Sequence, residues 1–227
     1  MPSENSSEAL YDLLSGRYSC RAYLPEPVPR ATIGEILRLA QRTASWCNSQ
    51  PWRVCVTSGA ATERFRAAYH AHSLGRAATP DFAFPAEYHG AYLERRRECG
   101  FQLYQSVGIA RGDRVASARQ TMENFRLFGA PHAAIITTEA VLGVYGAIDC
   151  GAYAANFMLA AHSLGIASIA QAALAAHPQF IREHFGLPDN RLVVCGISFG
   201  YADQQHPVNQ FRTSRAGLEE AVSWVDD

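Results

Sequence analysis

The chain has 227 residues, of which 48% are hydrophobic and 18% are charged, and its formal net charge is -1. That length and apolar content suit one domain, residues 1–227, with a sizeable core. The sequence has neither a basic field nor a polybasic tract, which argues against nucleic acid and membrane surfaces as partners.

All 20 basic residues are arginine, because the chain contains no lysine. A lysine Schiff base, a P-loop lysine and a lysine general base are therefore excluded. Any anion has to be held by arginine, by backbone N–H groups or by hydroxyls.

The six cysteines form no C-x-x-C pair, and three of them lie in apolar runs. They are expected to be reduced thiols. The polar N-terminus lacks the order of a signal peptide, so a cytoplasmic location is expected.

Helices and strands can be expected from periodicity and residue type. The segment 30–43 places Ile33, Ile36, Leu37 and Ala40 at helical spacing, and 191–199 is a continuous apolar run. In chain order, the segments expected are helix 7–16, helix 30–43, strand 53–57, helix 60–72, helix 86–106, helix 111–128, strand 133–138, helix 147–164, strand 165–170, helix 177–185 and strand 191–199. These elements predict an α+β domain with a central sheet of four to five strands, mixed or antiparallel, surrounded by helices. The last strand is expected to be covered on both faces.

The region from about 73 to 130 is a helical insertion with two polar helices. It could form a flap over a site, or it could be a structural excursion without a functional role.

The stretch Ser45–Arg53 carries two carboxamides, Asn48 and Gln50, just before an apolar strand. A carboxamide offers a donor and an acceptor on one head, which suits the edge of an uncharged heterocycle such as a flavin. Pro51 is expected to bias Gln50 towards an extended conformation. A polar loop between a helix and a strand is the alternative.

Two further clusters are rich in arginine. Arg17, Ser19 and Arg21 alternate, so an extended chain would point all three to one side, where forked guanidiniums suit a phosphate. The C-terminal cluster 209–215 adds Arg212 and Arg215 beside hydroxyls. Taken singly, each cluster could also be a solvated surface.

Other sites have no support in the sequence. There is no G-x-G-x-x-G after a strand, no Walker lysine motif and no G-x-S-x-G elbow. His70 and His72 lack a third ligand and diverge on a helix, so no metal is expected.

Together, the three clusters resemble the nitroreductase family of flavoenzymes over nearly the whole chain. The resemblance rests on their order and spacing: Arg-x-Ser-x-Arg at 17–21, Asn-x-Gln-Pro-Trp at 48–52, Leu-Gly-Ile at 164–166, Ala-Gln-Ala-Ala at 170–173, Gly-Tyr-Ala-Asp at 200–203, and Asn209 followed by Arg-Thr-Ser-Arg at 212–215. Arg-x-Ser-x-Arg without lysine is closest to the subgroup that reduces nitrobenzoates.

The resemblance implies a nitroreductase-like fold and an intertwined homodimer with FMN in two clefts at the interface. A C-terminal extension, about 204–227, would embrace the partner, and 73–130 would cover the site. The cofactor-binding residues implied are Arg17, Tyr18, Ser19, Arg21, Asn48, Gln50, Ala170, Gln171, Ala172, Arg212 and Arg215. Substrate contacts are expected from Trp46, Phe125 and Phe128, and no side chain is expected to act as a catalytic acid or base.

The chemistry that the resemblance implies is ping-pong. NAD(P)H would deliver hydride to flavin N5, and a nitroaromatic would then take electron pairs and pass through nitroso to hydroxylamine. Three alternatives are kept: a reductive dehalogenase of the same superfamily, another flavin reductase or dehydrogenase, and a non-catalytic FMN-binding protein.

Overall fold

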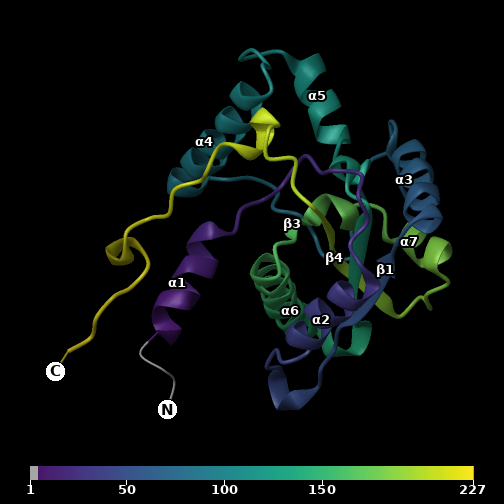
Figure 1. Cartoon of the computed structure of the whole chain (residues 1–227), viewed down its shortest axis with the longest axis horizontal. Helices are drawn as coiled ribbons and strands as arrows, with labels where there is room; N and C mark the ends of the chain where they lie inside the picture. The colour runs from purple at the N-terminus through teal and green to yellow at the C-terminus, as the bar shows by residue number, and fades with distance from the viewer. Residues whose placement is uncertain (1–4, 227) are drawn as a thin grey trace.

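A four-stranded antiparallel sheet forms the centre of the protein, which is described here by a computed structural model covering residues 5–226 (Figure 1). The strands are β1 (Arg53–Thr57), β2 (His132–Glu139), β3 (Ala167–Gln171) and β4 (Arg191–Gly200), in the order β1-β2-β4-β3. Each strand lies where the sequence predicts one, and the α+β class is confirmed.

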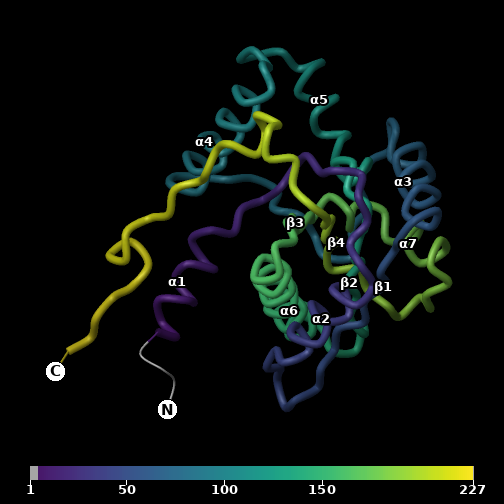
Figure 2. The backbone as a smooth tube through the Cα atoms, in the orientation of Figure 1, coloured from purple at the N-terminus to yellow at the C-terminus, as the bar shows by residue number. Residues whose placement is uncertain are grey.

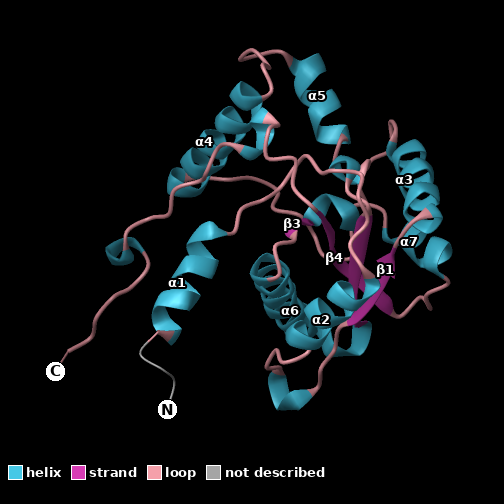
Figure 3. Ribbon diagram, in the orientation of Figure 1, coloured by secondary structure: helices cyan, strands magenta, loops and turns pink. Residues whose placement is uncertain are grey.

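The described residues form seven α-helices. They are α1 (Ser6–Gly16), α2 (Arg30–Ala40), α3 (Ala60–Ser73), α4 (Gly90–Ser106), α5 (Arg114–Met122), α6 (Gly143–Ser163) and α7 (Pro178–Phe185). Of these, α2, α3, α6 and α7 pack against the sheet (Figure 3).

Four helices differ from the sequence prediction by three residues or more, and one of them is α2, which ends at Ala40 rather than at residue 43. α4 begins at Gly90 rather than at residue 86, and α6 begins at Gly143 rather than at residue 147. α5 is shorter at both ends, because the Asp113 side chain accepts a hydrogen bond from the Ala116 N–H and so caps its start. Beyond its end, Leu127 and Phe128 have positive φ values of 59° and 52°, which no helix contains.

The core has two parts because β2 alternates between the two faces of the sheet. Ala134 and Ile136 pack with α2 and α6, whereas Ala133 and Ile135 pack with α3 and α7. The central pair β2–β4 is therefore covered on both faces, as the apolar run of β4 predicts.

A bulge in β4 changes which way its side chains point. The register shifts between Ile136 and Thr137, so that Ile136 pairs with Cys195 and Thr137 pairs with Val193. Because one extra residue inverts the alternation, Val193 packs with α3 and α7 whereas Ile197 packs with α2 and α6.

The helices α4 and α5 project away from the sheet and contain no buried residue (Figure 1). The C-terminal segment after β4 also runs outward, and its trace ends on the same side of the molecule as α1 (Figure 2). No helix within residues 5–226 has the length and apolarity needed to span a lipid bilayer.

Candidate functional site

The N-terminal segment that carries Arg17, Ser19 and Arg21 lies along the outer edge of β3. Ser19 forms a parallel bridge with Ser168, and the Cys20 N–H donates to the Ser168 carbonyl at 3.2 Å. The edge of β3 is thus covered by a short extended segment, which holds the three alternating side chains in place.

Asn209 joins this segment to the C-terminal cluster. Its Oδ1 accepts from the Arg21 N–H at 2.8 Å, and its Nδ2 donates to the Ala22 carbonyl at 2.9 Å. Asn209 is only 2% exposed, so these bonds are shielded from water. The two ends of the chain therefore build one site, and their traces cross in Figure 2.

All the predicted phosphate-binding side chains line one cavity of about 630 Å³. We call it the arginine cavity; it is lined by Tyr11, Leu14, Ser15, Arg17, Tyr18, Ser19, Arg21, Cys99, Phe211, Arg212, Thr213 and Arg215. Its lining contains no carboxylate. The expected convergence of the N-terminal and C-terminal arginines is present.

None of these four arginines forms an ion pair with a carboxylate in the part of the chain that the structure describes. Burial lowers the pKa of Arg17, and the nearby charge of Arg215 lowers it further. Repulsion between guanidiniums in one cavity is relieved when an anion binds between them. The site is therefore suited to a phosphate.

Aromatic rings orient two of the arginines. The Arg212 guanidinium carbon lies 3.8 Å from the centroid of the Tyr18 ring, and that of Arg21 lies 5.7 Å from the centroid of the Phe211 ring. Such cation–π contacts fix a guanidinium without neutralising its charge. Tyr18 thus supports an arginine through its ring.

A smaller cavity of about 210 Å³ adjoins the arginine cavity and shares Arg21 with it. Here called the turn cavity, it is lined by Arg21, Leu103, Tyr104, Gln120, Thr121, Asn124, Phe128, Ile169, Ala170, Gln171 and Ala172. The Ala170–Ala172 turn and the α4–α5 region thus face each other across it. The sequence did not single out Tyr104 or Asn124, because nothing in a polar insertion marks which side chains face inward.

The side chain of Gln171 is already fully hydrogen-bonded. It is 3% exposed, its Oε1 accepts from the Ser198 hydroxyl, and its Nε2 donates to the backbone oxygen and the Oδ1 of Asn124 at 3.1 and 3.2 Å. A ligand in the turn cavity would therefore meet the main chain of this residue rather than its carboxamide.

The carboxamide loop, residues 45–52, is conformationally strained, and it is exposed at 46–50 but buried at Pro51 and Trp52. Cys47, Asn48 and Gln50 have positive φ values of 49°, 54° and 46°. The expected extended conformation of Gln50 is wrong, because the loop turns back and the Gln50 N–H donates to the Ser45 Oγ at 2.9 Å. Strained backbone of this kind often marks functional loops.

The carboxamide loop and the segment that carries the arginines contact α6 at well-separated positions. The Trp46 N–H donates to Asp149 in the first half of α6. Gly16, the residue before Arg17, lies against His162 at its end, where an added Cβ would be 2.8 Å from the imidazole Nε2. The 13 steps along the chain from Asp149 to His162 span about 20 Å of helix. One chain therefore does not bring Asn48 and Gln50 to the arginines.

The three side chains expected to contact substrate lie in different places. Trp46 is 54% exposed and packs edge-on against Tyr145 in the carboxamide loop region. Phe128 lines the turn cavity. Phe125 instead packs against Tyr69 in the core between α3 and α7, and it lines neither cavity.

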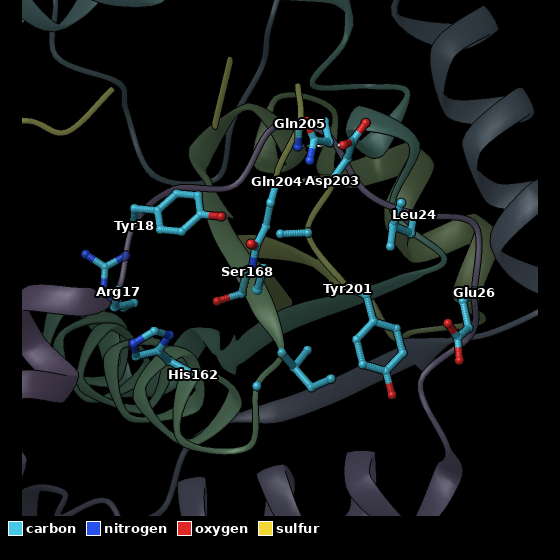
Figure 4. Close-up of a pocket in the computed structure, with 14 residues that line it drawn as sticks. Arg17, Tyr18, Leu24, Glu26, His162, Ser168, Tyr201, Asp203, Gln204 and Gln205 are labelled. Carbon is cyan, nitrogen blue, oxygen red and sulfur yellow. Dashed lines mark hydrogen bonds between the residues drawn. The ribbon is translucent and has the colours of Figure 1, made fainter. Parts of the chain in front are cut away.

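A third cavity, of about 590 Å³, lies behind Arg17 and Tyr18. Figure 4 shows Arg17 and His162 close together on one side of it, with Tyr201 and Glu26 on the other. Burial lowers the pKa of His162, and the charge of Arg17 lowers it further. His162 therefore favours its neutral form beside Arg17.

Comparisons with known proteins agree with this geometry. Residues 14–201 match the model of the Nitroreductase family. The nitroreductase NfnB of Mycolicibacterium smegmatis is 38% identical over 226 residues, covering 97% of this chain and 94% of that protein. A 4-nitrobenzoate reductase of a Nocardioides species is 34% identical, covering 97% of this chain and 92% of its own.

The crystal structure of the FMN-dependent nitroreductase NfnB from Mycobacterium smegmatis in complex with NADPH superimposes with a TM-score of 0.91, covering 97% of this chain and 99% of that one. From the family match, these relatives and the shared fold, the chain belongs to the nitroreductase family.

Proposed function

We propose that this protein is an FMN-dependent oxidoreductase that uses NAD(P)H to reduce nitroaromatic compounds by a ping-pong mechanism. The observation that carries the proposal is the arginine cavity, in which four guanidiniums without carboxylate partners meet one hydroxyl-bearing segment. The relatives support it as well, since one is an FMN-dependent nitroreductase in complex with NADPH and another is a 4-nitrobenzoate reductase.

The residues present fit FMN at both of its ends. The phosphate would lie in the arginine cavity, held by Arg17, Ser19 and Arg215, with Tyr18 and Arg212 beside it. The ring would extend towards the turn cavity and lie against the main chain of Ala170 to Ala172. Arg21 lines both cavities, so it would lie between the phosphate and the ring.

The second half of the site would come from a second copy of the chain. Asn48 and Gln50 are exposed but their loop contacts α6 well away from the arginines, so they would address the flavin ring of the partner in a homodimer. α6 offers a surface for that contact, because its exposed face is mostly apolar or small. This face contains Val144, Tyr145, Ile148, Gly151, Ala152 and Ala155.

We also infer roles for the two outlying segments. The C-terminal extension exposes Leu218 by 65%, Trp224 by 78% and Val225 by 93%, and contact with the partner would bury these side chains. The α4–α5 region would act as the flap over the ring, because Tyr104, Asn124 and Phe128 line the turn cavity.

When bound, FMN would supply the redox chemistry: it would accept hydride from NAD(P)H and pass electron pairs to the nitro group, which with protons from solvent would lose one oxygen as water to give nitroso and then be reduced to hydroxylamine. The chain's own residues bind, orient and set the electrostatics. Arg21 would favour negative charge on the ring edge that it faces. Neither the arginine cavity nor the turn cavity is lined by a carboxylate or an imidazole, so we assign no side-chain acid or base.

Anaerobic stopped-flow absorbance of the FMN-loaded protein tests the proposal. We expect NADPH or NADH to bleach the flavin band, and 4-nitrobenzoate to restore it after the nucleotide product has left. A flavin that bleaches but is not reoxidised by nitroaromatics would refute the proposal that nitroaromatic compounds are the electron acceptors. A flavin that neither nucleotide bleaches would refute the reductase activity and favour a binding protein.

A further inference from the structure

The carboxamide of Gln171 connects the sheet to the α4–α5 region. Gln171 is the last residue of β3, and Asn124 follows the end of α5. The Nε2 of Gln171 donates to both oxygens that Asn124 presents, the backbone oxygen at 3.1 Å and Oδ1 at 3.2 Å. The two residues are 47 positions apart in the sequence, so this contact is tertiary.

The orientation of this carboxamide is fixed from its other end. Its Oε1 accepts from the Ser198 hydroxyl on β4, so the amide group has to direct its N–H bonds towards Asn124. With 3% of the residue exposed, water cannot replace these partners. A glutamate in the same position would place a carboxylate oxygen against the backbone oxygen and the Oδ1 of Asn124, and neither bond could form.

Apart from the packing of Phe125 against Tyr69, few other contacts hold the flap. α4 and α5 contain no buried residue. Within the described residues, only two side-chain pairs hydrogen-bond the segment 90–126 to the rest of the chain: Gln171 with Asn124, and Arg95 with Glu220. The second pair is about half exposed on both sides and is therefore weak.

The turn that follows Asn124 is buried, so the chain is held in place immediately after this contact. Leu127 and Phe128 both have positive φ values, and they are 0% and 8% exposed. Their burial holds the chain beyond the contact, whereas the helices before it have no such support. Asn124 is therefore the point at which α5 joins the fixed part of the chain beside the turn cavity.

We propose that Gln171 is a positioning residue that holds the flap over the acceptor-binding cleft, so that its side chain sets the affinity for aromatic acceptors while its main chain faces the cofactor. This inference rests on the proposed function in one respect, which is that an aromatic acceptor binds in the cleft below the flap. The flap contact itself does not depend on the activity.

The first test is amide hydrogen exchange of the full-length, FMN-loaded protein. In Gln171→Leu and Gln171→Glu, we expect exchange in 90–122 to accelerate roughly 5–30-fold, the range that corresponds to losing one or two weak interactions. Exchange in α6 should stay unchanged. Ser198→Ala removes only the bond that orients the carboxamide and keeps the Gln171 side chain, so it should accelerate exchange in 90–122 less than Gln171→Leu does.

The second test compares acceptors of different size. We expect Gln171→Leu to raise the KM for 4-nitrobenzoate by roughly tenfold relative to the KM for ferricyanide, a small oxidant that does not need an enclosed cleft. Ser198→Ala should change that ratio less than Gln171→Leu does.

Two results would overturn the inference. Flap exchange in Gln171→Leu that matches the wild type would show that the contact does not hold the flap, and equal acceleration in α6 would show general destabilisation instead. If the wild-type flavin is never reoxidised by nitroaromatics, the proposed function fails, while hydrogen exchange still decides whether Gln171 holds the flap.

Discussion

Complementation between two inactive variants tests whether the site is shared between subunits. One variant carries Asn48→Ala and Gln50→Ala, and the other carries Arg17→Ala and Arg215→Ala. About 20 Å of α6 separates these two groups within one chain, far beyond the reach of a hydrogen bond. Each functional site should therefore draw its carboxamides from one subunit and its arginines from the other.

The expected recovery follows from two-fold symmetry. Each variant alone has two defective sites, whereas a mixed dimer has one site with all four substitutions and one site with none. Random exchange gives half mixed dimers, so the mixture should recover about a quarter of the wild-type activity per chain. Each deleted charged hydrogen bond should itself cost about 1.5–3 kcal/mol of FMN binding, enough to keep the arginine variant inactive at low FMN.

The assay mixes the two variants under conditions that allow subunit exchange and then measures nitroaromatic reduction against mixing time. Native mass spectrometry counts the mixed dimers, and mixtures of each variant with itself are the controls. If mixed dimers form but no activity returns, Asn48 and Gln50 do not serve the partner's site, and the reasoning from α6 is refuted.

Three further outcomes are expected. Arg17→Gln should weaken FMN binding about 10–100-fold by flavin fluorescence, whereas Arg64→Gln on the exposed face of α3 should not; equal affinities would contradict a phosphate role for the arginine cavity. Phe157→Ala, at a fully buried position of α6, should lower the free energy of unfolding by about 3–5 kcal/mol in urea, and a loss as small as that of the exposed Phe101→Ala would refute its core role. Burial lowers the pKa of His132, which accepts from the Val28 N–H through Nε2. The unfolded chain therefore binds a proton at His132 more readily than the folded chain does. The free energy of unfolding should fall as the pH drops from about 6.5 towards the lowered pKa. In urea titrations, His132→Asn should make the free energy of unfolding depend less on pH over that range.

The local pattern of the sequence predicted the elements well, because their periodicity is strong. Ile33 and Ile36 mark α2 by helical spacing, and the apolar run of β4 correctly predicts cover on both faces. The arginine cavity could also be expected, since alternation along an extended segment is a local property. Arg17, Ser19 and Arg21 do line one cavity.

Features that depend on tertiary packing could not be predicted in the same way. Positive φ values at Leu127 and Phe128 have no sequence signal, because neither residue favours them; burial against the sheet imposes them. Likewise, the aromatic character of Phe125 does not reveal that it packs against Tyr69 rather than facing a cavity. The distance between Asn48 and the arginines depends on where the two segments contact α6, which the sequence does not show.

The bonds of Asn209 to Arg21 and Ala22 join residues that are 188 and 187 positions apart. Arg21 and Ala22 therefore leave the ribosome long before Asn209 does, and all four strands lie between them in the sequence. The Arg21 N–H therefore gains this partner only once Asn209 has been synthesised. A chain that stops between residues 200 and 208 contains all four strands but lacks Asn209, so it should fold its sheet without gaining a closed arginine cavity, and the cofactor should load only onto longer chains.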